Sequence, residues 1–235
     1  MKTKNYNILA KNSSWTFGKK VPKKFDQHIK KSVPFYEESH NLICNLSDFF
    51  LQDGSIVYDI GSSTGTTLNM IHKRHSNKKL KLIGIEKIPE MIHQAKKNKT
   101  HKSIQYLNKD VEKIKLKKSD MIISNFTMQF IRSKKRQDII NKIYESLNWG
   151  GAFIMFEKIR GSDARFQDIF TSLYNEFKLS SGFSEKEILN KSRSLKGVME
   201  PFSNYGNESM LVRSGFKDIT PVFQWVCFKG YLAIK

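Results

Sequence analysis

The chain has 235 residues, with 41 lysine or arginine side chains against 22 aspartate or glutamate, a formal net charge of +19. Its 39% hydrophobic and 12% aromatic residues exclude a disordered protein and can build the core of one full-sized domain. The first residues contain no apolar h-region and no apolar run could span a bilayer, so we expect a soluble, cytoplasmic protein with no membrane partner. Cys44 and Cys227 lie far apart in the sequence, so we expect them to be free thiols in a reducing compartment.

The positive charge has two interpretations. A field of this sign attracts nucleic acid or anionic metabolites, but the basic residues are spread along the whole chain, as in NKKLKL, AKKNKTHKS and KIKLKKSD. The sequence contains no aromatic-interleaved RNA-binding motif and no Cys/His finger. We therefore favour a lysine-rich solvated surface over a dedicated RNA-binding face.

In chain order, residues 1–20 are a polar arm with an aromatic cluster at 15–17, and apolar spacings of three and four predict helices over 22–52. Strand and helix patterns then alternate. Strands are predicted at 55–60, 81–86, 104–107, 120–127 and 152–159. Helices are predicted at 67–75, at 89–98 with proline in first position, and at 136–151 with the pair Gly150–Gly151 as C-cap.

After residue 160 the alternation stops. Residues 162–200 are typical of two or three helices, and a helix near 208–216 precedes strands at 219–228 and 230–235, joined by a turn at Lys229–Gly230. The alternation predicts an α/β protein with a doubly wound, mostly parallel sheet. The closing antiparallel hairpin resembles the class I methyltransferase variant of the Rossmann fold, with seven strands and a helical insertion.

We expect one domain over residues 1–235. Its predicted parts are an N-terminal arm and helices at 1–52, a nucleotide-binding core at 53–160, a helical insertion or cap at 161–205, and a C-terminal helix and hairpin at 206–235.

A glycine turn follows the first strand of the core. The stretch from Asp59 to Gly65 lacks the Gly-Lys-Ser/Thr of a phosphate-binding loop and the third glycine of the dinucleotide fingerprint. It fits the looser methyltransferase form Asp-x-Gly-x-x-x-Gly, with Ser63 at the middle glycine position. Gly61 would let the backbone approach a ligand, and Asp59 can accept a hydrogen bond from an amine. An unoccupied strand-to-helix turn has the same pattern.

Three further strands end in polar side chains. Glu86 ends the second strand and is placed to accept hydrogen bonds from two ribose hydroxyls. Asp110, with the amide of Val111 beside it, is placed to receive an adenine amino group, and Asn125 ends the fourth strand. Ligands bind at the carboxyl ends of strands in open α/β sheets. Four such features in order predict S-adenosylmethionine as the ligand.

Several segments resemble one specific family, the carboxy-S-adenosylmethionine synthases. The similarity runs from about Trp15 to Lys235. It rests on WTF at 15–17, KSVPFY at 31–36, YDIGSSTGTTL at 58–68, NFTMQF at 125–130, EFKLSSGFSEKEILNKSRSLKGVMEP at 176–201 and the C-terminal FQWVCFKGYLAIK. The glycine loop is common to many S-adenosylmethionine folds, whereas the other segments are far more specific.

The resemblance implies an enzyme that uses prephenate to convert S-adenosylmethionine into carboxy-S-adenosylmethionine, with release of phenylpyruvate. The product would serve a partner enzyme that modifies the wobble uridine of tRNA, so contact of this chain with tRNA itself would be weak or indirect. The family also implies a homodimer.

The resemblance assigns roles residue by residue. Arg193 would hold the carboxylate of the product, from its own or the neighbouring subunit, although a lone helix arginine is more often solvated. Tyr36 would line the methionine end, and both Arg193 and Tyr36 would take part in the reaction. The remaining contacts would be Gly61, Ser62 and Ser63 to the donor, Glu86 to the ribose, Asp110 and Val111 to the adenine, and Asn125 to the amino-acid portion.

Three positions depart from the usual family pattern. Ser62 stands where cysteine is usual, Glu86 replaces an aspartate, and Lys87 places a cation beside the adenosine in place of asparagine. These changes leave S-adenosylmethionine binding intact and mark the chain as a divergent member of the family.

Two alternatives stay open. One is an ordinary S-adenosylmethionine-dependent methyltransferase acting on a small molecule or tRNA, and the other is a catalytically silent module that binds an adenosyl ligand and docks tRNA through its charge. Metal catalysis is not expected, because His72 and His75 have no third ligand nearby in sequence. A serine hydrolase is disfavoured because no G-x-S-x-G elbow is present.

Overall fold

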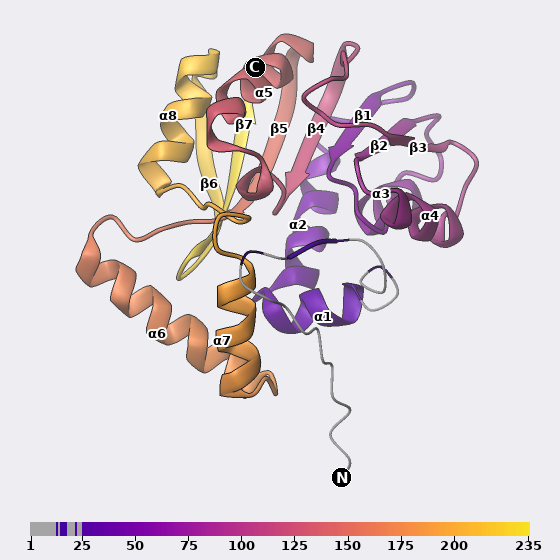
Figure 1. The fold of residues 1–235 in the computed structure, drawn as a ribbon. Coiled ribbons are helices and arrows are strands. Elements are labelled where there is room, and N and C mark those ends of the chain that lie inside the picture. The colour runs from indigo at the N-terminus through magenta and orange to yellow at the C-terminus, as the bar shows by residue number, and fades with distance from the viewer. Residues whose placement is uncertain (1–12, 14, 18–21, 23–24) are drawn as a thin grey trace.

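The computed structural model describes residues 13, 15–17, 22 and 25–235, and they form a seven-stranded mixed sheet covered by helices (Figure 1). The strand order is β3-β2-β1-β4-β5-β7-β6. The first five strands are parallel, and β7 pairs antiparallel with both β5 and β6. The strands are β1 (Ile56–Ile60), β2 (Lys81–Glu86), β3 (Ile104–Asn108), β4 (Ser119–Asn125), β5 (Leu147–Lys158), β6 (Asp218–Trp225) and β7 (Phe228–Ile234).

Alternation along the strands builds one hydrophobic core on each face of the sheet. In β1, for example, Val57 packs with one core while Tyr58 and Ile60 pack with the other. The first core is closed by α2 (Tyr36–Ser47), α3 (Thr66–Arg74) and α4 (Pro89–Asn98). The second is closed by α5 (Ser133–Ser146) and α8 (Asn204–Ser214). The parallel sheet is therefore buried on both faces, as near-continuous apolar strands predict.

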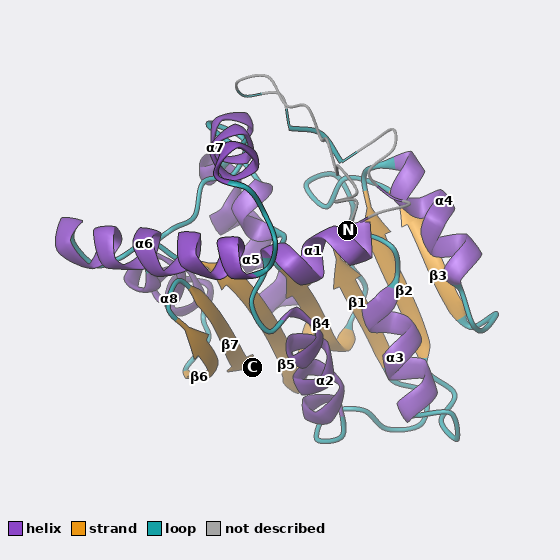
Figure 2. Cartoon of the chain, turned by 90° about the horizontal axis from the view of Figure 1, so that it is seen from below, coloured by secondary structure: helices purple, strands orange, loops and turns teal. Residues whose placement is uncertain are grey.

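Three helices lie beyond the carboxyl ends of the parallel strands. They are α1 (Phe25–Ser32), α6 (Ala164–Ser180) and α7 (Glu185–Ser194) (Figures 1 and 2). The chain leaves the sheet after β5 to form α6 and α7, and it returns through an isolated bridge between Arg160 and Ser203. We call α6 and α7 the cap. The helices expected over 162–200 are present, and the division of the domain into four parts stays a prediction.

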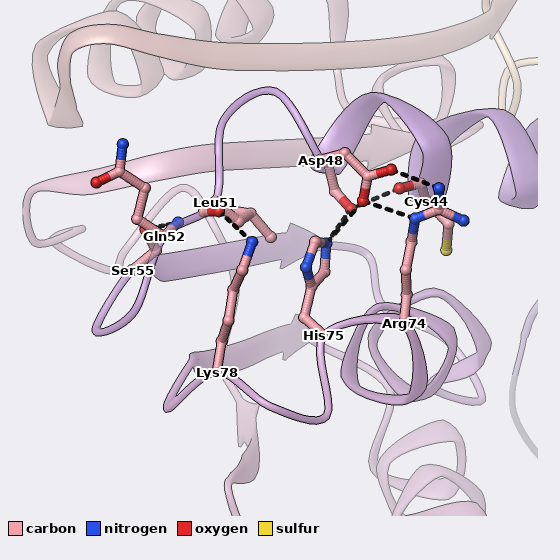
Figure 3. A network of polar contacts seen from close by, with 9 residues as sticks. Cys44, Asp48, Leu51, Gln52, Ser55, Arg74, His75 and Lys78 are labelled. Carbon is pink, nitrogen blue, oxygen red and sulfur yellow. Dashed lines mark hydrogen bonds and ion pairs between the residues drawn. The ribbon is translucent and has the colours of Figure 1, made fainter.

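At the opposite end, a polar network fastens α2 to the end of α3 (Figure 3). Asp48 forms an ion pair with Arg74 and lies 3.6 Å from the ring of His75. The Nε2 atom of His75 is 2.7 Å from the hydroxyl of Ser47, and Lys78 donates to the carbonyl of Leu51 at 2.7 Å. His75 is thus a structural residue of this junction.

The glycine pair at 150–151 does not cap a helix. Helix α5 ends at Ser146, and β5 already begins at Leu147, which is fully buried and pairs with Ser119 of β4. Gly150 takes a left-handed φ of 75° inside β5, where the register with β4 shifts. Burial of Leu147 in the core therefore overrides the local capping signal.

The predicted position of the hairpin turn, at Lys229–Gly230, is wrong by three residues. Strands β6 and β7 are joined at Val226–Cys227, where Val226 has a φ of 46°. Gly230 lies inside β7, and a Cβ placed on it would come within 2.6 Å of the Phe156 ring. Glycine is needed there for close packing against that ring rather than for a turn.

Candidate active site

A cavity of about 1070 Å³ opens at the carboxyl ends of β1, β2 and β4, under the cap. This is the switch point of the sheet, where the order of strands reverses between β1 and β4. The cavity is slightly larger than the volumes of roughly 300–1,000 Å³ that are usual for small-molecule sites, so it has room for two small ligands. Nine of the predicted contact residues line it, namely Tyr36, Gly61, Ser62, Ser63, Glu86, Lys87, Asp110, Val111 and Asn125.

The glycine loop is locked in place by its neighbours. Gly61 has a φ of 74°, and a Cβ there would come within 2.3 Å of the Thr127 hydroxyl oxygen. The amides of Gly61 and Ser62 both donate to the carbonyl of Ile85 in β2. Ser63 takes a left-handed φ of 49° although it carries a side chain. The strain stored at Ser63 is typical of a functional loop that its surroundings hold in one shape.

Glu86 and Asp59 form the acidic side of the cavity. The two carboxylate oxygens of Glu86 accept hydrogen bonds from the amides of Ser63 at 3.2 Å and Ile88 at 2.9 Å. Burial raises the pKa of Glu86, and these amides oppose that rise. Burial and the neighbouring charge of Glu86 raise the pKa of Asp59 to about 7. A cationic group of a ligand would favour the ionised form of both.

Asn125 provides an observation that points to a ligand. Its side-chain oxygen and nitrogen are both buried, and neither has a hydrogen-bond partner within the described structure. An unpaired buried amide costs roughly 1–3 kcal/mol for each group. The next residue, Phe126, has a left-handed φ of 56°. The cavity wall thus holds an amide whose donors and acceptor suit the amino-acid portion of S-adenosylmethionine.

The remaining predicted contacts lie on either side of the loop. Tyr36, the first residue of α2, packs edge-on against His40 with ring centroids 4.6 Å apart, and burial raises its pKa. Asp110 lies two residues beyond the end of β3, and its Oδ1 accepts from the amide of Glu112 at 2.9 Å. Val111 is buried. Lys87 is exposed and also lines the cavity.

Arg193 is the exception among the predicted residues. It is exposed near the end of α7 and does not line the cavity within a single chain, whereas its neighbour Ser192 does. Its carbonyl accepts a backbone hydrogen bond from Ser13, and the amide of Trp15 donates to the carbonyl of Ser194, so these two residues lie against this end of the cap. Most of the polar arm expected at 1–20 lies outside the described residues. Its proposed contact with a product carboxylate stays a prediction.

Sequence reasoning missed the basic residues that line the cavity on β5, on the cap and on the segments that join them to the rest of the chain. They are Lys158, Arg160, Lys178, Lys191 and Lys196. The first ends β5, so the rule that ligands bind at strand ends could have found it. Sequence reasoning also missed the buried Glu157, whose carboxylate accepts a hydrogen bond from the amide of Met128 at 2.9 Å and so holds the NFTMQF loop. Burial raises the pKa of Glu157 to about 8.

Comparison with known proteins first defines the class. A family model described as a methyltransferase domain matches residues 57–151. The structure of phosphoethanolamine N-methyltransferase 2 from Haemonchus contortus superposes with a TM-score of 0.66 at 13% identity, and the match covers 92% of this chain and 57% of that one. At this identity the likeness shows the fold alone. The fold is the class I S-adenosylmethionine-dependent methyltransferase fold, as the sequence predicted.

Closer relatives define the family. The carboxy-S-adenosyl-L-methionine synthase of Staphylococcus epidermidis is 37% identical over 235 residues, which are 98% of this chain and 100% of that protein. The protein of the same name from Nautilia profundicola is 38% identical over 222 residues, 93% of this chain and 94% of its own length. The chain therefore belongs to the carboxy-S-adenosyl-L-methionine synthase family. The predicted resemblance, the enzyme class and S-adenosylmethionine as cofactor are confirmed.

Proposed function

We propose that the enzyme converts S-adenosylmethionine and prephenate into carboxy-S-adenosylmethionine and phenylpyruvate, for use in tRNA wobble uridine modification. The observation that carries the proposal is that one cavity is lined both by carboxylates at the strand ends and by the lysine pair Lys158 and Lys178. Asp59, Glu86 and Asp110 lie at or just beyond the ends of β1, β2 and β3, and the two lysines lie on β5 and α6. The carboxylates suit the hydroxyls and amines of the donor, and the lysine pair suits an anionic second substrate.

The cavity supports a reaction in which carbon dioxide must not escape. The sulfonium of the donor acidifies its methyl group, so that removal of a proton gives a stabilised carbanion. Loss of carbon dioxide and hydroxide from prephenate forms the aromatic ring of phenylpyruvate, and the hydroxide leaves with the methyl proton as water. The carbanion then attacks carbon dioxide. Trapping requires both reactants side by side in one pocket, and a cavity of about 1070 Å³ under the cap leaves room for both.

A mass measurement tests this proposal. The purified enzyme, S-adenosylmethionine and prephenate are mixed, and the mass of the adenosyl product is measured by mass spectrometry. We expect the carboxylated donor, together with phenylpyruvate in equal amount. Formation of S-adenosylhomocysteine and a methylated acceptor would instead establish an ordinary methyltransferase, and the proposed synthase activity would be wrong.

The exposed surface of the cap supports a homodimer as part of the proposal. Helix α6 projects from the body of the domain in both views (Figures 1 and 2) and buries none of its residues. Phe166, Ile169 and Leu173 follow one another at spacings of three and four, and each is exposed by 44–47%. A second copy of the chain would cover this apolar stripe and bring Arg193 of one subunit toward the cavity of the other.

We also propose that contact with tRNA is weak and that the enzyme works in the cytoplasm. Both cysteines are free and buried, which suits a reducing compartment. No helix within the described part of the chain is long and apolar enough to cross a membrane. Binding of unfractionated tRNA should fall by roughly ten- to a thousandfold between 50 and 200 mM salt. A tight complex with one tRNA that resists this salt change would contradict the proposal.

A further inference from the structure

Two lysines of the cavity share one aromatic ring. The ammonium nitrogen of Lys158, at the end of β5, lies 4.2 Å from the centroid of the Tyr174 ring, and that of Lys178 lies 4.3 Å from the same centroid. Tyr174 and Lys178 both belong to α6, one turn apart. All three residues line the cavity. The cap and the sheet thus place two ammonium groups around one aromatic ring.

The rest of the structure leaves these charges unbalanced. Among the described residues, no ion pair links either lysine to a carboxylate. Burial lowers the pKa of Lys158, and burial together with the charge of Lys158 lowers the pKa of Lys178 to about 8. The nearby thiol of Cys227 provides no counter-charge at neutral pH, because burial raises its pKa. An anion in the cavity would relieve both the repulsion and the desolvation.

Tyr174 holds this arrangement in a fixed position. Its hydroxyl donates to the carbonyl of Ser32 at 2.7 Å, which ties the cap to α1. Its ring packs edge-on against Phe228 with centroids 5.1 Å apart. The lysine heads therefore lie beside an apolar aromatic wall. Such a site suits a molecule that joins a carboxylate to an unsaturated or aromatic ring.

We propose that Lys158 and Lys178, supported by Tyr174, form a carboxylate-binding subsite that receives the second substrate of the enzyme. The ligand class is a cyclic or aryl acid, held with its carboxylate on the two ammonium groups and its ring against Phe228. This proposal rests on the proposed function for the identity of that acid. It adds residues to the site that the family resemblance did not assign.

The first experiment compares Lys158→Met and Lys178→Met with Lys186→Met, a matched control on the exposed side of the cap outside the cavity lining. The KM for prephenate should rise about ten- to a hundredfold in the first two variants, because each loses a charge-assisted contact. The affinity for S-adenosylhomocysteine should stay within about twofold in all three, because the adenosyl half is untouched. Lys158→Arg should recover part of the loss.

A second experiment separates the subsite from the proposed reaction. Phenylpyruvate is titrated by calorimetry into protein saturated with S-adenosylhomocysteine. If the wild type makes no carboxylated donor but binds phenylpyruvate through both lysines, the proposed function fails and the subsite stands. If the wild type makes the product and both lysine variants keep its KM and its phenylpyruvate affinity, the subsite is overturned. Lack of phenylpyruvate and prephenate binding by the wild type would also overturn it.

A third measurement needs no variant and so does not depend on folding of the mutants. The lowered pKa of Lys178 makes its amine reactive toward acetic anhydride at pH 8. Acetylation of each lysine is then quantified by peptide mass spectrometry, with and without phenylpyruvate. We expect protection of Lys178 and unchanged labelling of the exposed Lys186. Equal labelling of Lys178 in both samples would contradict the proposal.

Discussion

Each carboxylate oxygen of Glu86 carries a backbone hydrogen bond before any ligand is present, one from Ser63 and one from Ile88. These bonds fix the orientation of the carboxylate at the end of β2 and leave further lone pairs for two ribose hydroxyls. Glu86→Ala should therefore weaken every adenosyl ligand, carboxylated or not, by about 1.5–3 kcal/mol. Calorimetric titration with both donors measures this loss, and Glu86→Asp should restore most of it. Unchanged affinity of Glu86→Ala for both donors would refute the ribose assignment.

Asp59 makes donor binding depend on pH. Its pKa of about 7 in the free protein means that lowering the pH from 8 protonates the carboxyl. The ammonium of the donor needs the ionised form, so affinity should fall as the pH drops from 8 toward 5.5, and binding should release a proton. Above pH 8 the amine of the ligand, with an ordinary pKa near 8, limits affinity instead.

Calorimetry in two buffers with different ionisation enthalpies measures this proton release. Asp59→Asn keeps the shape of the side chain and removes its titration, so it should bind weakly at pH 8 and lose the acidic limb of the profile. A wild-type affinity that stays constant between pH 8 and pH 5.5 would remove Asp59 from the amine site.

At the scale of secondary structure, glycines with the same backbone conformation serve different needs. Gly215 ends α8 with a φ of 114°, and a Cβ there would come within 2.7 Å of the Tyr144 ring on α5. Gly150 has a φ of 75° in β5 but open space around it. Gly150→Ala should cost about 1 kcal/mol of unfolding free energy for its φ alone, and Gly215→Ala about 2–4 kcal/mol because the ring must also move. Urea denaturation of both variants tests this, and equal losses would contradict it.

The elements that sequence reasoning found and missed follow from the range of the interactions. Glu86 and Asn125 were found because parallel strands bring their carboxyl ends to one edge, a rule that needs no side-chain packing. The turn at Val226–Cys227 was missed because Gly230 was taken as a turn glycine. Gly230 is instead required by its close packing against the ring of Phe156, which is 74 positions away along the chain. Lys178 was missed for the same reason, since α6 meets β5 only in the folded chain.

At the scale of the whole molecule, the proposed role of Arg193 requires more than a single chain. The charge of +19 is spread over the surface, yet the arginine expected at the product carboxylate lies outside the cavity lining. The apolar stripe of α6, which also belongs to the cap, is exposed as well. One association of two chains would bury the stripe and add a cation to each cavity. Oligomerisation and product recognition would then depend on the same contact.

Arg193 should accordingly distinguish the two donors. Arg193→Leu should weaken carboxy-S-adenosylmethionine more than S-adenosylmethionine by about 2–4 kcal/mol, because only the former leaves a buried carboxylate unpaired. Arg193→Lys should recover part of this difference, since an ammonium cannot make two parallel hydrogen bonds. Paired titrations measure the effect, with circular dichroism to verify folding. An equal loss for both donors would reduce Arg193 to a structural role.

Mixing two impaired variants, assayed at a donor concentration too low for either one alone to turn over, tests whether Arg193 acts across the dimer. Chains with Arg193→Leu keep an intact adenosyl site, and chains with Glu86→Ala keep the arginine. If Arg193 serves the neighbouring subunit, each mixed dimer regains one complete site, formed by the cavity of the first chain and the arginine of the second. After dissociation and reassociation in equal amounts, about half of the dimers are mixed, so activity should return to about a quarter of the wild-type value. If Arg193 serves its own cavity, both sites of a mixed dimer stay damaged and mixing should restore nothing.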